Sequence, residues 1–432
     1  MICVIKTFNS CFPKTSFLKR NITPFIWRFT QVLFKQGTTA VMFFIATYLL
    51  TKEDMGMYGY VSSTLLLLTL FTDFGISTSV SRYVALYNSQ EKERVKKVFF
   101  NLGLVILSVS VIVIVVVLSF RKVLFPKTPH YLVYALPMIF INPLTSLMDG
   151  ILRGLKKFKR LAIVTIVNSV IGILASYFLV TNFGIKGAIV APLTYYTSYL
   201  LILLFSHRGY KFKLDRKVLK DILTYAIYFG IAALGHYLFS KVNVLILGKE
   251  NLFEEIAVYE LLNKINTEFL LPFIVIGQVL APTVVEEFAK KKFTGIQNQF
   301  KKLLFSTLVF SIIFIPFSMI ISTVAIKLLF PIYFGEILES ILLPVTLTFA
   351  TAVPVVVINT GIITSTGHGK LMAIQNILSG IINVILNIVV IKQYGYIAVV
   401  WVTFGVQLLS NIVLYLVYYF KLKSLKERSI EA

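Results

Sequence analysis

Charged residues are scarce in this sequence, and acidic residues are the scarcest of them. Asp, Glu, Lys and Arg make up 14% of the 432 residues, whereas a soluble globular chain carries about 25%. Hydrophobic residues make up 57% and the mean hydropathy is +0.84, so too little polar surface exists to cover a water-soluble fold. These values exclude the soluble domains that the length alone would suggest, and they predict an integral membrane protein.

Cysteine and histidine are nearly absent as well. The two cysteines, Cys3 and Cys11, lie near the N-terminus, and neither their spacing nor that of the four histidines fits a metal site. The sequence has no glycine-rich phosphate loop and no nucleophile elbow, and its first residues lack the apolar run of a secretory signal peptide. We therefore expect no metal, no cofactor and no enzymatic activity.

Apolar runs of about 20 residues, the length that crosses a bilayer as a helix, recur along the whole chain. They predict an all-α integral membrane protein with twelve transmembrane helices. The predicted spans are 25–50, 57–80, 98–120, 131–152, 161–181, 185–206, 223–247, 256–281, 303–329, 341–365, 371–391 and 395–420. The connections between them are too short to hold a folded domain outside the membrane.

Lysine and arginine are distributed unevenly among these connections. Thirty of the 42 lie in alternate connections and the two termini, eight lie in the opposite connections, and four lie within the spans. Because cytoplasmic loops carry the excess of Lys and Arg, this pattern predicts a multi-pass protein of the cytoplasmic membrane with both termini cytoplasmic. Cations around a membrane rim favour anionic membrane lipids as partners and disfavour nucleic acid.

The sequence also contains an internal repeat. A shift of 211 positions superimposes Pro143 on Pro354, Gly150 on Gly361, Lys159 on Lys370 and Gly184 on Gly395. A weaker shift of 201 positions pairs Tyr58 with Tyr259. The repeat predicts two copies of a six-helix unit that are related by a pseudo-two-fold axis along the membrane normal. This arrangement is typical of transporters with a substrate path between the halves. The predicted parts are a tail (1–24), an N-lobe (25–206), a linker (207–222), a C-lobe (223–420) and a tail (421–432).

Several short stretches of the sequence form a recognisable set, namely TKEDMGMYGY, TLFTDFGISTSVSRYVA, LGKENLFEEIAVYELLNK, NFGIKGAIVAPL and QYGYIAVVWV. Together they resemble the repeat-unit (O-antigen type) polysaccharide flippases of the multidrug/oligosaccharidyl-lipid/polysaccharide (MOP) exporter superfamily. The resemblance covers residues 20–420. It implies two six-helix bundles splayed in a V around a central cavity, a lipid-linked oligosaccharide as substrate, and glycosyltransferases and a polymerase of a polysaccharide pathway as partners.

Two cations lie within the first span. Arg28 and Lys35 are seven residues apart, so both point from one face of the helix, and Lys35 lies roughly 15 Å from the cytoplasmic end. A central Lys or Arg costs about 2.5–3.5 kcal/mol, so such residues normally face a bundle interior or a hydrated cavity. Arg28 is shallow enough to snorkel to the interface. Asp73 on the second span either neutralises Lys35 or serves only as the end residue of its helix, in which case Lys35 is available to a substrate.

The other charges within spans gather in the seventh and eighth. Glu260, Lys264 and Glu268 follow at i, i+4 and i+8, where opposite charges meet on one face. We expect Lys264 either to pair within its own helix or, with Asp73, to bind substrate in the cavity, and the carboxylates Glu260, Glu268 and Asp73 are the candidates for a coupling ion. His236 is expected to be a satisfied core histidine or to line the cavity.

Four further residues complete the set of candidates. Lys241 lies near the outer end of its span, where it is expected either to snorkel or to line the cavity. Arg82, Asp149 and Arg153 are expected at the cytoplasmic mouth, with Asp149 and Arg153 paired across one turn. Since the charges within the spans concentrate on spans 1, 2, 7 and 8, these helices are expected to line the cavity.

The leading hypothesis is a flippase that moves a polyprenyl-diphosphate-linked oligosaccharide from the inner to the outer leaflet by alternating access through a cationic cavity. Its cycle is driven by H⁺, Na⁺ or the membrane potential, among which the sequence does not choose. An ion-coupled antiporter for organic cations is the alternative, although such a protein needs a cavity of net negative charge. A membrane glycosyltransferase is disfavoured because the external loops are short.

Overall fold

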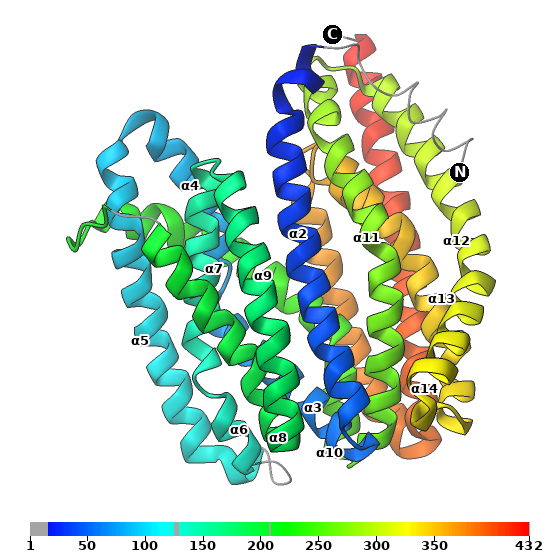
Figure 1. The fold of residues 1–432 in the computed structure, drawn as a ribbon. Helices are drawn as coiled ribbons and strands as arrows, with labels where there is room; N and C mark the ends of the chain where they lie inside the picture. Colours follow the sequence, from blue (N-terminus) through cyan, green and yellow to red (C-terminus); the bar gives the residue numbers. More distant parts are fainter. Residues whose placement is uncertain (1–15, 125–128, 207–208, 432) are drawn as a thin grey trace.

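The protein was analysed as a computed structural model that describes residues 16–124, 129–206 and 209–431 (Figure 1). Every regular element in these ranges is a helix. The helices of the first half are α2 (Ser16–Leu49), α3 (Lys52–Asp73), α4 (Ile76–Gln90), α5 (Lys92–Leu124), α6 (Pro129–Ala135), α7 (Met138–Gly154) and α8 (Phe158–Ser206). Those of the second half are α9 (Arg216–Ser240), α10 (Val242–Lys249), α11 (Phe253–Ala289), α12 (Phe293–Leu329), η1 (Pro331–Tyr333), α13 (Glu336–Ile358), the π-turn η2 (Asn359–Ile363) and α14 (Gly369–Glu431). Cys3 and Cys11 lie outside the described residues.

Ten helical stretches of the described chain are long and apolar enough to cross a membrane, and the chain is a multi-pass membrane protein. Two of them, α8 with 49 residues and α14 with 63, are far longer than one crossing requires. Each is interrupted by a glycine with non-helical backbone angles, Gly184 at φ 53° and Gly395 at φ 69°. Glycine adopts positive φ without a steric penalty. These two residues are also a matched pair of the 211-residue repeat, so the same position breaks the corresponding helix in both halves.

Three of the predicted spans are not continuous helices, which corrects the prediction, and one of them, 131–152, is interrupted at residues 136–137 between α6 and α7. The span 57–80 is broken where Phe74 (φ 32°) and Gly75 (φ 81°) separate α3 from α4. A side chain on Gly75 would begin 2.4 Å from the carbonyl oxygen of Ala226, so this turn packs directly against α9. The span 223–247 is broken at Lys241, which ends α9 and begins α10. Hydropathy cannot detect these breaks because the flanking residues stay apolar.

The packing of the helices follows the sequence repeat. Helix α2 packs most extensively against α8, and its counterpart α9 packs most extensively against α14. Helices α3 and α11 cross each other and connect the two halves. In Figure 1, α4 to α7 lie on one side of the molecule and α11 to α14 on the other, and the beginning of α2 lies at the same end as the end of α14.

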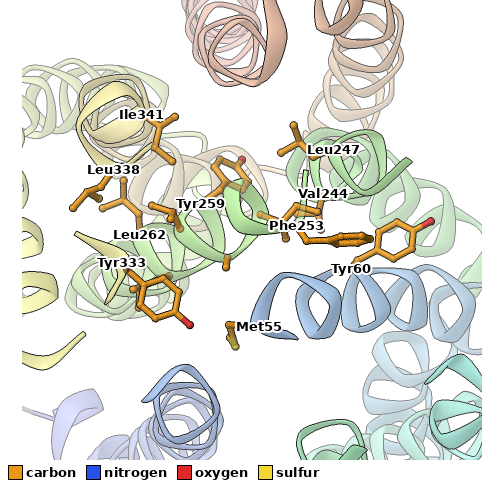
Figure 2. Close-up of a cluster of buried hydrophobic side chains, with 14 of the residues drawn as sticks. Met55, Tyr60, Val244, Leu247, Phe253, Tyr259, Leu262, Tyr333, Leu338 and Ile341 are labelled. Carbon is orange, nitrogen blue, oxygen red and sulfur yellow. The ribbon is translucent and has the colours of Figure 1, made fainter. Parts of the chain in front are cut away.

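A cluster of buried apolar side chains joins the two halves at the end where α3 and α10 are labelled (Figures 1 and 2). Met55 and Tyr60 of α3 contribute to it from the first half, and Leu247 and Phe253 contribute from the second. The backbones also approach closely here, since a side chain on Gly56 would collide with the carbonyl group of Phe253. Apolar burial and dispersion contacts therefore close this end of the molecule.

Amide side chains hold α10 against α14 in the second half. Asn243 donates from Nδ2 to the Thr403 hydroxyl at 2.7 Å, and Asn387 donates from Nδ2 to Asn243 Oδ1 at 2.8 Å. Asn383 donates to the same oxygen at 3.2 Å. All four side chains are buried. Hydrogen bonds between helices contribute about 0.6 kcal/mol each on average in membrane proteins, so the network mainly fixes the register of the two helices.

Candidate functional site

A cluster of charged and polar side chains lies inside the first half, where α2, α7 and α8 meet. We define the cationic site as Arg28, Gln31, Lys35, Asp149, Arg153 and Tyr199. Helix α2 contributes the first three residues, whose spacings of three and four place them on one face. The prediction that Arg28 and Lys35 share a face is confirmed, since Gln31 links Arg28 to Asp149, and Lys35 lies 5.7 Å from the ring of Tyr199, which also contacts Asp149.

Asp149 is the centre of the cationic site. Its carboxylate accepts a hydrogen bond from Gln31 Nε2 at 2.6 Å and forms an ion pair with Arg153 Nε at 2.9 Å. The Tyr199 hydroxyl donates to it at 3.4 Å, which is a weak contact. The side chain is buried, with 5% exposed. The predicted Asp149–Arg153 pair is confirmed, and the structure adds that this pair belongs to the same site as Lys35.

The two cations of α2 differ in how they are satisfied. Arg28 donates from Nη1 to Gln31 Oε1, so its guanidinium is held along its own helix. The ammonium group of Lys35 forms no ion pair within the described chain and lies 5.7 Å from the centre of the Tyr199 ring. With Arg153, the site holds three cations against the single carboxylate of Asp149. A surplus positive charge therefore remains in the interior of the first half.

Asp73 does not neutralise Lys35, and that alternative is wrong. Its carboxylate accepts from the Ser77 backbone N–H at 3.2 Å and from the Ser77 hydroxyl at 2.9 Å. Asp73 is the last residue of α3, so these bonds join α3 to α4 across the turn at Phe74 and Gly75. The structure thus supports the other alternative, in which Asp73 is a residue of the helix end.

The charges of the second half pair with one another. Lys264 forms an ion pair with Glu268 at 3.0 Å on α11, as predicted. Glu260 does not join them, because both of its carboxylate oxygens accept from Lys241 Nζ at 2.9 and 2.7 Å. Lys241 therefore does not snorkel, contrary to one of the two expectations for it. His236 is exposed, so it is not a satisfied core histidine, and the Ser240 hydroxyl donates to its backbone oxygen at 2.8 Å.

Arg82 lies apart from the cationic site. Its guanidinium stacks on the ring of Tyr225 at 4.5 Å and donates to the hydroxyl of the same residue. This contact connects α4 with α9, and the Arg82 side chain is exposed. Arg82 therefore acts in the packing of the two helices, and it does not share a partner with Asp149 or Arg153.

The cationic site is confined to the first half of the repeat. At the 211-residue shift, the positions of Asp149 and Arg153 are taken in the second half by Thr360 and Thr364. These threonines cannot hold a charge, so the two halves have the same fold but different electrostatics.

Two residues of the site, Gln31 and Tyr199, were not among the predicted candidates. Gln31 connects Arg28 to Asp149, and Tyr199 contacts Gln31, Asp149 and Thr165. A signal for Gln31 existed, because it lies on the helix face that carries the two cations. No comparable signal marked Tyr199, since tyrosine is frequent in the apolar spans.

The geometry of the cationic site suits a polyvalent anion. Unit charges 4 Å apart interact by about 4 kcal/mol at the effective dielectric constant of a partly hydrated protein site. Lys supplies three rotatable donors and Arg a planar fork, and both are the common partners of phosphate oxygens. Within the described residues no cluster of His, Cys, Asp or Glu has the spacing of a metal site. Binding and orienting an anion is therefore the chemistry that these groups can perform.

Comparisons with known proteins give a family and a fold. The model of the family described as "Polysaccharide biosynthesis protein" matches residues 23–288. No curated protein matches at a significant level. An inward-facing multidrug resistance MATE family transporter of the MOP superfamily has a similar structure, with 16% identity, a TM-score of 0.70 and coverage of 92% of this chain and 96% of that chain.

Two further solved structures share this fold. A MOP superfamily transporter from Pyrococcus furiosus is 15% identical, with a TM-score of 0.61 over 94% of this chain and 96% of that chain. Its structure is described by the words "reverse polarity of binding pocket suggests different function". A MATE protein in complex with MaL6 is 16% identical, with a TM-score of 0.59 over the same shares of the two chains. At these identities the similarity shows the fold alone.

Proposed function

The chain belongs to the polysaccharide biosynthesis protein family, and from that premise we propose that it flips a polyprenyl-diphosphate-linked oligosaccharide across the cytoplasmic membrane. The observation that carries the proposal is the surplus positive charge of the cationic site. Arg28, Lys35 and Arg153 share the single carboxylate of Asp149 inside the first half, and only Arg153 lies within ion-pair distance of it in the described chain. The diphosphate is the ligand group whose charge matches this surplus.

The physical need for such a site follows from the cargo. A diphosphate moved through hydrocarbon without compensation would lose its hydration at a prohibitive cost. A cationic site within a membrane-spanning bundle replaces part of that hydration with fixed donors, while the polyprenyl tail stays in the lipid. The cationic site would receive the headgroup from the inner leaflet. The same charges would retard release, so the outward-facing state must hold the diphosphate less tightly.

The transport cycle proposed here uses the two halves as rigid units. The chain would cross the membrane twelve times if α8 and α14 each span it twice, with reversals at Gly184 and Gly395. This count gives two six-helix bundles and places both termini in the cytoplasm. The apolar cluster around Met55, Tyr60 and Phe253 would then close the outer side, as expected for a state that receives cargo from the inside.

The energy source remains a choice between H⁺, Na⁺ and the membrane potential. The carboxylates available for ion coupling are Glu260 and Glu268, both paired with lysines, and Asp73, which is bonded to Ser77. Movement of a net negative cargo outward is itself favoured by an inside-negative potential. The proposed partners are anionic membrane lipids around the basic rim and the glycosyltransferases and polymerase that act before and after the flipping step.

An antiporter for organic cations is the second candidate, because the fold is that of multidrug MATE transporters. The positive charge of the cationic site argues against this second candidate. A cation exporter requires a pocket of net negative charge, whereas the first half of this chain holds surplus positive charge. The transporter described with a reversed pocket polarity gives a precedent within the fold for a change of function with a change of charge.

Transport into proteoliposomes tests the proposal and separates the two candidates. Purified protein is reconstituted with a fluorescent polyprenyl-diphosphate-oligosaccharide, and a membrane-impermeant quencher reports its appearance in the opposite leaflet. We expect flipping by the wild type and its loss in Lys35→Gln. Uptake of an organic cation such as ethidium that is retained or increased in Lys35→Gln, with no lipid flipping by the wild type, would establish the antiporter instead.

A further inference from the structure

We propose that a cavity next to the cationic site is a subsite for the uncharged sugar attached to the diphosphate. The cavity has a volume of about 200 Å³ and lies among α2, α3, α7 and α8. Its polar lining consists of tyrosine, serine, threonine and asparagine side chains, among them Tyr58, Ser62, Asn142, Tyr195 and Tyr196. No Asp, Glu, Lys or Arg lines it. This inference rests on the proposed function and extends it to the recognition of the cargo.

The cavity and the cationic site are stacked along the same three helices. On α2, Thr39 of the cavity follows Lys35 by one turn. On α8, Tyr195 of the cavity precedes Tyr199 by one turn, and the two rings are parallel with centres 6.3 Å apart. Residues three, four or seven apart lie on one face of a helix.

Helix α7 also carries one residue of the cavity and one residue of the cationic site. Asn142 of the cavity precedes Asp149 of the cationic site by seven residues, or two turns. Each of the three helices therefore presents one residue to the cationic site and another to the cavity. A ligand with a diphosphate beside a sugar ring has the same order of groups.

Tyr195 provides the second observation that points to a ligand. Its side chain is fully buried, with 0% exposed, and it lines the cavity. Its hydroxyl makes no hydrogen bond of normal geometry within the described chain, although the Asn168 side chain lies near enough to interact with it. The Asn168 amide also donates to the Tyr195 carbonyl oxygen and accepts from the Ser198 hydroxyl, so any contact with the Tyr195 hydroxyl is shared with these bonds. Buried tyrosine hydroxyls normally find a partner, so this group is available to a polar ligand.

The lining matches the chemistry of an uncharged sugar. Tyrosine presents an apolar ring and a hydroxyl, which suit the C–H face and the hydroxyl groups of a pyranose. Asn142 offers an amide with two donors and an acceptor, and it makes no hydrogen bond to other described residues. Pockets for drug-sized ligands measure about 300–1,000 Å³, so a cavity of about 200 Å³ suits one ring and not an oligosaccharide.

The test compares two lipids on variants that remove one polar group each. The probes are polyprenyl diphosphate and the same lipid bearing a single galactose, and their dissociation constants are measured with the protein in nanodiscs. Tyr195→Phe removes only the hydroxyl, and Asn142→Leu removes only the amide at similar size. Tyr415→Phe is the matched control, because Tyr415 is another buried tyrosine whose hydroxyl has no partner and which lies outside the cavity.

The subsite predicts a selective loss. The wild type should bind the galactose-bearing lipid more tightly than the bare lipid, and Tyr195→Phe and Asn142→Leu should each reduce this preference by roughly 3- to 10-fold. Neither variant should change the affinity for the bare lipid, and Tyr415→Phe should change neither affinity. Tyr195→Phe should retain the thermal stability of the wild type as closely as Tyr415→Phe does, since neither hydroxyl makes a hydrogen bond of normal geometry in the described chain.

Three results would overturn the inference, and they differ from failure of the proposed function. A wild type with equal affinity for the two lipids has no sugar subsite here. An equal loss of both affinities in Tyr195→Phe, or an equal effect of Tyr415→Phe, would mean that the hydroxyl acts on the fold. If the bare lipid does not bind at all, or binds equally to Lys35→Gln, the proposed function fails and the subsite with it.

Discussion

Replacing Lys35 with glutamine tests the role of the surplus charge. No carboxylate of the described chain lies within ion-pair distance of the Lys35 ammonium, although Asp149 is near enough for the two charges to attract, and the ammonium lies 5.7 Å from the centre of the Tyr199 ring. Glutamine keeps the approximate length of the side chain and a donor group but removes the charge. The change therefore subtracts one charge from the cationic site without breaking an ion pair, which makes the result easier to interpret than that of most charge substitutions.

The expected magnitude follows from the kind of bond that Lys35 would form. A hydrogen bond between charged groups contributes about 1.5–3 kcal/mol. At about 1.4 kcal/mol for each factor of ten, the affinity for a polyprenyl-diphosphate-oligosaccharide should fall roughly 10- to 150-fold. Folding should not suffer, because a lysine without a partner inside a bundle costs free energy, and its neutralisation should leave the melting temperature unchanged or higher.

Binding in nanodiscs and melting of the purified protein measure the two effects separately. Lys35→Arg keeps the charge and serves as the control, with an affinity within a few-fold of the wild type. Equal binding by Lys35→Gln and the wild type would refute the reasoning, and so would an equal loss in Lys35→Arg. A large fall in melting temperature for Lys35→Gln would also contradict it, since Lys35 would then have a structural partner.

Three further predictions concern other charges. Asp149→Asn should bind the diphosphate lipid roughly 3- to 30-fold more tightly, because it removes about 0.7–2 kcal/mol of repulsion between the carboxylate and the diphosphate. Transport should nevertheless slow, because release of the lipid is retarded. Weaker binding of the lipid in nanodiscs would contradict this prediction. Lys241→Ala should lower the free energy of unfolding by about 1–3 kcal/mol, since it leaves Glu260 unpaired, and adding Glu260→Ala should restore part of it in thermal melts. Burial alone would raise the pKa of Asp215, but the hydrogen bond from Lys97 and other contacts lower it below 3.8. This stabilisation is present above pH 3.8 and is lost as pH falls through the lowered pKa, so Asp215→Asn should show a smaller loss of melting temperature on acidification; identical profiles would refute the assignment.

Much of the fold could be predicted because membrane spans and repeats leave strong signals in sequence. The matched glycines at 184 and 395 were identified from the repeat, and both break a long helix in the structure. The breaks at Phe74–Gly75 and Lys241 were missed, because an apolar run continues through a change in backbone direction. Hydropathy measures the environment of a segment, whereas the path of its backbone depends on tertiary contacts.

The site was predicted in part for a similar reason. Helical spacing places Arg28 and Lys35 on one face, and it also gives the Asp149–Arg153 pair. The contact between these two groups joins helices far apart in the sequence, and no local pattern reports it. Depth alone suggested Asp73 as the partner of Lys35, and this was wrong because Asp73 bonds to Ser77 across a turn that the sequence did not reveal.

A structure of the protein in nanodiscs with bound polyprenyl-diphosphate-oligosaccharide would test the central claim most directly. The account predicts density for the diphosphate within hydrogen-bond distance of Lys35 and Arg28, on the inner face of α2. Density for the diphosphate at the paired charges of Lys241 and Glu260, or the cationic site left empty at saturating lipid, would contradict it.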